Sequence, residues 1–366
     1  MREKIRHGFI LKGDVDENHP KEVENMKMSH FIARRLFYSI FVLLGLSIVI
    51  FTMSRIFPGD PARTALGTLA PQWAVDNLRE QLHLNDPIYV QYWIWLTNAL
   101  HGDLGMSLVT KRPVNTDLAT FFPATFELVI FSIIISITIS VVVGVTAGRR
   151  ANSLFDNIVR VVSYLGIAMP SFVWAIIAMF LFGYLWKILP ALGRLSMGTV
   201  HPPRITGMLT IDSLITGNFA AFFDALKHMI LPGSALAVGR LAQDTRLMRS
   251  SIVENLRKDY IAAAMSYGIP ERTVMFKYLM KPSLIPVVSI MGLEISGAMA
   301  GSFIIEFIFN WPGFGRYGAN AMLNKDLNAI IGSVMVVGVF FALINIAVDV
   351  IIAYLDPRIR MAVRSE

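Results

Sequence analysis

Residues 124–147 read ATFELVIFSIIISITISVVVGVTA. A helix that crosses the hydrocarbon core of a bilayer needs about 20 predominantly apolar residues, and this run is long enough. Buried strands of a parallel sheet are also rich in β-branched residues, but they span only about 4–8 residues. Strands of a membrane barrel alternate apolar and polar side chains, and these residues do not. The run therefore predicts a membrane-spanning helix.

The composition indicates several such helices. Hydrophobic residues make up 54% of the 366 residues and charged residues only 16%, whereas a soluble globular chain carries about 25% charged residues. The formal net charge of +7 is typical of basic cytoplasmic loops in a membrane protein, so we expect no nucleic-acid partner. Because the chain has no cysteine, it has no disulfide, no thiol nucleophile and no thiolate metal ligand.

Six segments are long and apolar enough to span a bilayer. They lie at 31–54, 124–147, 158–187, 229–248, 284–309 and 329–355. The third is interrupted by Gly166 and Pro170. The fourth is the weakest, because it carries Arg240, Asp244 and Arg246. The predicted fold class is an all-α membrane protein with six transmembrane helices.

Basic residues in the short loops indicate the orientation. They follow the second span, fill the segment 240–281 and occur again in the last residues. With six spans, all three stretches lie on the side of the N-terminus, which the positive-inside rule makes cytoplasmic. A five-span chain without the weak fourth helix would place the C-terminal arginines outside, and we disfavour it. The predicted division is a cytoplasmic extension 1–30, a transmembrane domain 31–360 with an outer segment 55–123, and a cytoplasmic tail 361–366.

The outer segments also have some predicted structure. Short helices are expected at 72–84 and 89–100, where Trp93 and Trp95 suit a membrane interface. A surface helix with no ligand role is the preferred interpretation there. The second outer segment, 188–228, is interpreted as a spacer rather than as a docking surface.

A polar segment separates the fourth and fifth spans. Residues 258–286 read KDYIAAAMSYGIPERTVMFKYLMKPSLIP. The pattern predicts two short helices with a tight turn at Gly268, since glycine ends helices readily. Asp259 lies favourably at the start of the first helix and Pro270 is tolerated at the start of the second. Small side chains allow such a knob to sit close to a partner, although a solvated hairpin between two spans has the same pattern.

Nine further motifs, in order, resemble one family. They are Phe57-Pro-Gly-Asp-Pro61, Asp86-Pro-Ile-Tyr-Val-Gln-Tyr92, Gly102-Asp-Leu-Gly-Met-Ser107, Arg112-Pro-Val114, Phe122-Pro-Ala-Thr-Phe-Glu-Leu128, Pro170-Ser-Phe172, Leu189-Pro-Ala-Leu-Gly193, Glu306-Phe-Ile-Phe-Asn-Trp-Pro-Gly-Phe-Gly315 and Leu355-Asp-Pro-Arg-Ile-Arg360. With the polar segment, they cover nearly all of 31–360. The chain resembles the dipeptide, oligopeptide and nickel group of binding-protein-dependent ABC permeases, and it looks like the first of their two paired permeases.

The resemblance implies a type I importer permease fold with both termini inside and with cytoplasmic coupling helices. It makes 250–283 the coupling loop that docks on an ATPase. The implied coupling residues are Asp259, Tyr260, Ala262, Ala263, Ala264, Gly268, Pro270, Glu271 and Arg272. The implied partners are a second homologous permease, two ATPase subunits, an external substrate-binding protein and membrane lipid. ATP and magnesium would bind to the ATPase subunits. The implied location of the chain is the cytoplasmic membrane of a prokaryote.

Ionisable residues inside spans are costly and usually face a cavity or another helix. Glu294, Glu306, Arg240 and Asp244 are the candidates for the pathway or a gate. For Glu294, a hydrogen bond to a neighbouring helix or protonation in place is weighted equally with a role in the pathway. Glu306 is expected mainly to hold the turn that follows it. Asp349 is expected to pair with a cytoplasmic arginine. The small residues between 297 and 302 suit an interface between two permeases.

The motifs of an enzyme are missing from the sequence. There is no P-loop, no metal-binding histidine motif and no nucleophile elbow, so we predict no catalytic residue, no metal site and no cofactor in this chain. The predicted function is peptide import, with nickel, a metal chelate or an oligosaccharide as alternative cargo. Two other classes remain: an ion-coupled secondary transporter that uses Glu294 and Asp349, and a membrane scaffold that transports nothing.

Overall fold

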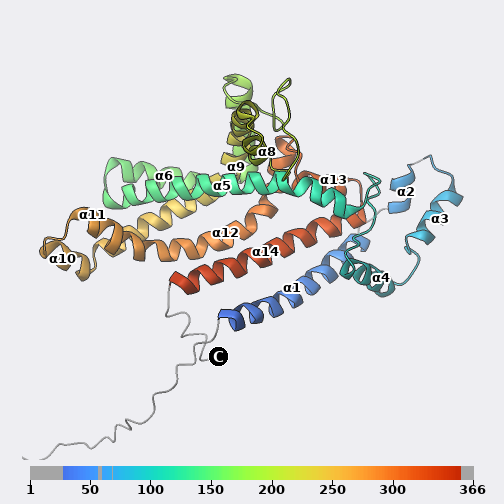
Figure 1. Ribbon diagram of the computed structural model, residues 1–366, viewed down its shortest axis with the longest axis horizontal. Coiled ribbons are helices and arrows are strands. Elements are labelled where there is room, and N and C mark those ends of the chain that lie inside the picture. The colour runs from blue at the N-terminus through green and yellow to red at the C-terminus, as the bar shows by residue number, and fades with distance from the viewer. Residues whose placement is uncertain (1–27, 57–59, 68, 356–366) are drawn as a thin grey trace, which may run out of the picture.

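The computed structural model describes residues 28–56, 60–67 and 69–355, and helices make up almost all of this part (Figure 1). The predicted tail 361–366 and nearly all of the predicted extension 1–30 lie outside the described residues. The helices, with two π-helical stretches η1 and η2, are α1 (Met28–Ile56), α2 (Pro61–Leu66), α3 (Gln72–Gln81), α4 (Ile88–Leu100), α5 (Val114–Arg149), α6 (Leu154–Ala168), α7 (Ser171–Ala178), η1 (Met179–Leu185), α8 (Leu209–Ile215), α9 (Phe219–Leu256), α10 (Asp259–Ser266), α11 (Glu271–Thr273), η2 (Val274–Leu279), α12 (Met280–Ile308), α13 (Phe314–Leu323) and α14 (Leu327–Leu355).

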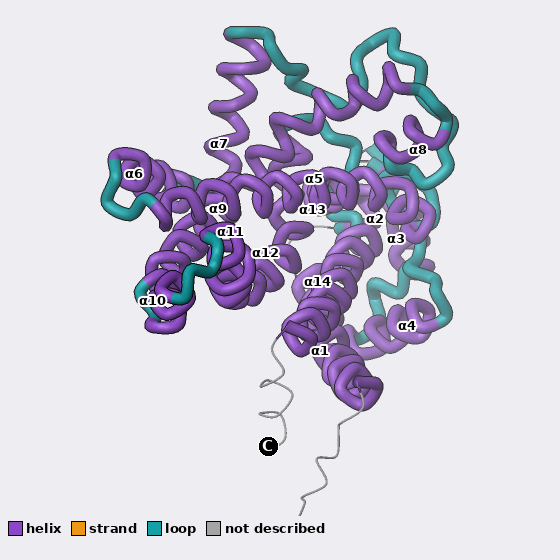
Figure 2. The backbone as a smooth tube through the Cα atoms, turned by 60° about the vertical axis from the view of Figure 1, so that its left-hand side comes forward, coloured by secondary structure: helices purple, strands orange, loops and turns teal. Residues whose placement is uncertain are grey.

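Long helices run side by side and place the shorter ones at their two ends. Helices α1, α14, α12 and α5 lie next to one another, and α9 packs along both α5 and α12 (Figure 1). Helices α6, α10 and α11 gather at one end, which we call the inner end, and α2, α3 and α4 at the other, the outer end. Figure 2 shows the same arrangement more nearly along the long helices, with α7 projecting away from them.

The structure supports four or five of the predicted spans by length and composition. Within the described residues, four helical stretches are apolar enough to cross a membrane, and a fifth is found if a bent helix pair counts as one span. The predicted fourth span, 229–248, belongs to the longer helix α9 and is not among them. The predicted fifth span, 284–309, corresponds to α12 (Met280–Ile308), which continues directly from η2.

The predicted third span, 158–187, is not one straight helix. Helix α6 and the α7–η1 stretch meet at 105°. The break lies at Pro170, which lacks a backbone N–H and holds Met169 in an extended conformation. The interruption expected at Gly166 is wrong, since α6 continues through it. A Cβ at Gly166 would lie 2.7 Å from the Cβ of Ala242, so this glycine serves the close packing of α6 on α9.

The two helices predicted in the first outer segment are confirmed as α3 and α4. Trp93 is 66% exposed, as an interface residue requires. Trp95 is instead buried, with its ring 5.9 Å from that of Phe51 in α1. The two tryptophans are two positions apart on a helix and therefore face different directions. Trp95 fastens the α2–α4 cap to the first span.

The ion pair expected for Asp349 is confirmed. Its carboxylate lies 3.1 Å from the Nε of Arg35, which ties the inner ends of α14 and α1 together. The arginine is half exposed, with 50% of its side chain accessible. A charge pair so placed helps to fix the register of two helices that otherwise meet through apolar side chains.

Candidate functional site

The predicted coupling loop forms two short helices around a glycine turn, as the sequence predicts. Helix α10 begins at Asp259, and α11 begins at Glu271 directly after Pro270. Gly268 has φ +71, and a Cβ built there would have no neighbour within 4 Å. The glycine is therefore required by backbone conformation and not by space, since L side chains rarely adopt positive φ. The turn projects from the inner end, beyond the long helices (Figure 1).

One face of this knob is anchored and the other is open. Ile261 and Ala264 are buried in an apolar cluster with residues of α9, η2 and α12. Ala264 was predicted to contact the ATPase, but its side chain faces inward, because it follows Ile261 by three positions on the same helical face. The other predicted coupling residues are exposed, namely Asp259, Tyr260, Ala262, Ala263, Gly268, Pro270, Glu271 and Arg272.

The open face also carries large apolar side chains that the sequence reasoning did not single out. Met265, Tyr267 and Phe276 are 54%, 86% and 68% exposed. A patch of this kind on a charged, solvent-facing loop is typical of an interaction surface. The signal available in the sequence was the presence of aromatic residues on the polar side of an amphipathic segment.

Close packing of α5 on α9 leads to the knob. A Cβ added at Gly144 would lie 2.7 Å from the Cβ of Met248, and one at Gly148 would lie 2.7 Å from the Cγ2 of Ile252. Met248 and Ile252 are fully buried and belong to the same apolar cluster as Ile261. Because packed interiors deform little, displacement of the knob is passed directly to α9 and α5.

A buried ion pair adds to this connection at the inner end. The Nε of Arg249 in α9 lies 2.5 Å from Oδ1 of Asp156, and its Nη2 lies 2.7 Å from Oδ2. The Asp156 side chain is fully buried. A two-pronged guanidinium–carboxylate contact fixes both distance and orientation. It therefore holds α6 against the part of α9 that precedes the coupling loop.

Three of the four pathway candidates come together between α5, α9 and α12. Arg240, Asp244 and Glu294 line a cavity of about 10 Å³ with Ser136. Arg240 donates to the hydroxyl of Ser132 at 2.7 Å, and the Asp244 carboxylate accepts from Ser136 at 3.4 Å. The carboxyl groups of Asp244 and Glu294 also interact with each other. The cluster thus brings a cationic and two acidic side chains together between three long helices.

The fourth candidate, Glu306, lies apart and is fully buried. Its Oε1 accepts from the Thr125 hydroxyl at 2.5 Å, and its Oε2 accepts from the backbone N–H of Arg316 at 2.9 Å. The Thr125 hydroxyl in turn accepts from the N–H of Phe314 at 2.8 Å. A Cβ at Gly313 would lie 2.5 Å from Oε2 of Glu306. These contacts hold the turn between α12 and α13, in agreement with the preferred expectation.

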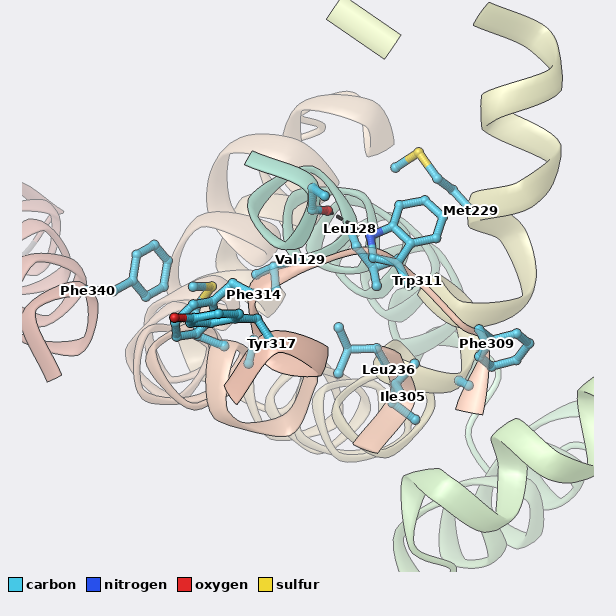
Figure 3. Close-up of a cluster of buried hydrophobic side chains, with 14 of the residues drawn as sticks. Leu128, Val129, Met229, Leu236, Ile305, Phe309, Trp311, Phe314, Tyr317 and Phe340 are labelled. Carbon is cyan, nitrogen blue, oxygen red and sulfur yellow. Dashed lines mark hydrogen bonds between the residues drawn. The ribbon is translucent and has the colours of Figure 1, made fainter. Parts of the chain in front are cut away.

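The same turn inserts Trp311 into the main apolar core. The indole N–H donates to the carbonyl oxygen of Ala124 at 3.0 Å, and Figure 3 shows the ring beside Leu128 with Met229 nearby. The guanidinium of Arg194 lies 5.4 Å from the ring centroid of Trp311. The motif after the fifth span therefore has a structural role, because Trp311 joins the end of α12 to α5.

The second outer segment, predicted to be a spacer, is packed on α5. The Glu127 carboxylate pairs with Arg194 and accepts from the backbone N–H of Thr210 at 2.6 Å. Pro123 lies inside α5 and cannot donate to the carbonyl of Ala119, and Arg204 donates to that carbonyl at 3.2 Å instead. Arg204 thus completes the hydrogen bonding at the proline.

Comparisons with known proteins agree with this architecture. Residues 140–361 match the model of the family described as binding-protein-dependent transport system inner membrane component. Residues 28–129 match the model of the N-terminal region of binding-protein-dependent transport system membrane components.

Curated relatives cover nearly the whole chain. A dipeptide transport system permease protein of Alkalihalophilus pseudofirmus is 38% identical over 91% of this chain and 100% of its own length. A probable D,D-dipeptide transport system permease protein of Escherichia coli is 35% identical over 90% and 96%. A glutathione transport system permease protein of Escherichia coli is 30% identical over 91% and 99%. Together with the family match, they show that the chain belongs to the inner membrane components of binding-protein-dependent transport systems.

Proposed function

We propose that this chain is the permease subunit of an ATP-driven importer for di- or oligopeptides and forms half of the translocation pathway. The observation that carries the proposal is the anchored knob of the coupling loop, packed onto α9 in a chain of this family. The relatives at 30–38% identity bear names of dipeptide and glutathione permeases, which favours peptide cargo over nickel, metal chelates or oligosaccharides.

The proposed assembly has three further subunits and an external substrate-binding protein. A second permease completes the pathway, and two ATPase subunits bind ATP and magnesium. A substrate-binding protein delivers the peptide on the outer side. The exposed small residues Gly297, Ala300 and Gly301 of α12 suit the contact with the second permease, because small side chains let helices approach closely.

Coupling in this proposal is mechanical. Closure of the ATPase dimer presses on the exposed face of α10 and α11, and the buried face passes the displacement to α9 and α12. Asp259, Glu271 and Arg272 offer charge for orienting the contact, and Met265, Tyr267 and Phe276 offer apolar area. The chemistry of ATP hydrolysis belongs to the partner subunits.

The charged cluster is the proposed contact of the chain with its cargo once the surrounding helices move apart, since its cavity of about 10 Å³ holds at most one water. A zwitterionic peptide presents an ammonium and a carboxylate, and the cluster offers Arg240 together with Asp244 and Glu294. Glu294→Gln removes one charge at nearly constant shape, so we expect slower peptide transport with unchanged assembly. Transport kinetics equal to those of the unaltered protein would leave Glu294 with a structural role only.

Uptake into proteoliposomes tests the proposal as a whole. The reconstituted complex, supplied with ATP and its binding protein, should import labelled dipeptide but neither nickel chelate nor oligosaccharide. Vanadate should abolish the uptake and an uncoupler should not. Uptake that an uncoupler abolishes and vanadate does not would identify an ion-coupled transporter instead, and no flux of any cargo would favour the scaffold.

A further inference from the structure

A large cavity with no role assigned so far lies at the outer ends of α1 and α14. It has a volume of about 810 Å³ and lies between the end of α1, the start of α14 and the α2–α4 cap. A neighbouring cavity of about 170 Å³ shares Arg55, Leu84 and Gln91 with it. Figure 1 shows these helix ends close to α2 and α4. They are the outer ends of two helices that are long and apolar enough to span a membrane.

Three buried polar atoms in these walls lack a partner among the described residues. They are Nε of Arg55, Oε1 of Gln91 and Nε1 of Trp95. Gln91 and Trp95 are each only 8% exposed, and the amide nitrogen of Gln91 is already used, donating to the carbonyl of Asp86 at 2.7 Å. Buried polar groups in proteins are nearly always hydrogen-bonded. Two donors and one acceptor on these walls are therefore available to a bound group.

The position of Arg55 is fixed by an aromatic base. Its guanidinium carbon lies 5.0 Å from the ring centroid of Phe51, and Phe51 is fully buried and packs edge-on against Tyr92. A cation over an aromatic face is attracted by the ring, which helps to hold the guanidinium in place. The edge of Arg55 is thus held in place at the wall of both cavities.

The charge and polarity of the cavity define the ligand. The larger cavity carries Arg55, Lys325 and the ion pair of Arg79 with Asp60 at 2.8 Å. The smaller cavity, which Trp95 lines, adds the carboxylate of Asp103, so cations still outnumber carboxylates by three to two. The rest of the wall is largely apolar and includes Met53, which is 50% exposed on α1. A ligand with an anionic headgroup and an apolar tail matches both the cationic part and the apolar part of the wall.

We propose that this cavity binds the headgroup of an anionic phospholipid, phosphatidylglycerol, from the adjacent leaflet. The phosphate oxygens accept from Arg55 and Trp95, and a glycerol hydroxyl donates to the free oxygen of Gln91. The acyl chains lie along the apolar outer ends of α1 and α14. This lipid site is separate from the cargo pathway and from the coupling loop.

Native mass spectrometry of the assembled, delipidated transporter tests the site. With phosphatidylglycerol added, the unaltered protein should retain a bound lipid that phosphatidylcholine with the same chains does not replace. Arg55→Gln removes a charge-assisted hydrogen bond and should weaken retention about tenfold. Trp95→Phe keeps the ring but loses one neutral donor, and should weaken it about fivefold.

The matched control is Lys187→Gln. Lys187 is an exposed cation near the end of η1 and lines neither cavity, so lipid retention should not change. Equal retention by Arg55→Gln and Lys187→Gln would overturn the proposal, as would equal binding of phosphatidylcholine. Displacement of the lipid by millimolar inorganic phosphate would also overturn it, because the site would then select a small anion and not a lipid.

Discussion

At the scale of single residues, Glu306 shows how one buried side chain organises a turn. Both of its oxygens accept hydrogen bonds, from Thr125 and from the backbone of Arg316. Gly313 leaves the space that the carboxylate occupies. A buried acceptor of this kind stabilises the fold only as long as its donors remain matched.

Glu306→Gln replaces one acceptor oxygen by an NH₂ group that faces an N–H or O–H donor. We expect a loss of about 1–3 kcal/mol in the free energy of unfolding, read as a lower thermal midpoint of the complex. Thr125→Val removes the shared hydroxyl, and the two losses should be less than additive because both changes break one network. Full additivity would contradict the network.

Asp212 provides a pH-dependent test in the outer segment. Burial raises the pKa of Asp212, but hydrogen bonds from the backbone and hydroxyl of Thr206 and the amides of Ile205 and Gly207 outweigh it and lower that pKa below its usual value. For a depressed folded-state pKa, the added stability is present above the unfolded value of about 3.9 and is lost as pH falls through the folded value.

We therefore expect hydrogen-exchange protection at residues 205–207 to fall as pH drops below about 4, once intrinsic exchange rates are divided out. Asp212→Asn lacks the second acceptor oxygen. It should show weaker protection at pH 7 and no loss on acidification. Equal acid sensitivity of the two proteins would show that another group governs this loop.

Some side-chain orientations could not be predicted from the sequence, because they depend on tertiary contacts. The spacing of the coupling loop correctly gave the helix starts at Asp259 and Glu271 and the glycine turn at Gly268. It did not give the inward direction of Ala264, because that depends on which side of α10 meets the core. Burial of Trp95 likewise follows from its tertiary partner Phe51.

At the scale of elements, the pair α5 and α9 is the part of the fold that links the knob to the membrane domain. Its close approach rests on Gly144 and Gly148, which lie one helical turn apart on α5. Any larger side chain on this stripe forces the two helices apart. The strain of overpacking typically costs about 1–3 kcal/mol.

Gly148→Val should therefore destabilise the complex by about 1–3 kcal/mol and reduce substrate-stimulated ATP hydrolysis. The control is Gly45→Val in α1, where an added Cβ has no neighbour within 4 Å. It has the same change of residue and the same β-branching cost in a helix. Thermal unfolding and hydrolysis of both variants are compared. Equal effects would mean that helix propensity, and not the α5–α9 contact, is responsible.

Helices could be predicted where hydropathy alone determines their position. They could not be predicted where contacts with other helices determine their length or direction. The runs at 31–54, 124–147 and 329–355 lie within α1, α5 and α14. The sequence shows the proline at position 170 but does not reveal that the two helices meet there at 105°. Helix α9 is long because its charged half is sheltered by α5 and α12, which no local pattern reveals.

At the scale of the whole molecule, the long helices join two functional ends. The coupling loop lies at the inner end, and the cap, the packed outer segment and the proposed lipid site lie at the outer end (Figure 1). The charged cluster of Arg240, Asp244 and Glu294 lies between them, where α5, α9 and α12 meet. In the proposed mechanism, motion of the knob reaches this cluster through α9, which carries two of its three residues.

The measurement that tests this account most directly is ATP hydrolysis by the lipid-reconstituted complex with its peptide-loaded binding protein. Gly268→Trp is compared with Gly217→Trp. Both glycines have positive φ, +71 and +70, and neither has a neighbour within 4 Å of an added Cβ. Only Gly268 lies on the knob. We predict that Gly268→Trp loses peptide-stimulated hydrolysis or ATPase assembly while Gly217→Trp retains both. Normal peptide-stimulated hydrolysis in Gly268→Trp would contradict the coupling role of the knob.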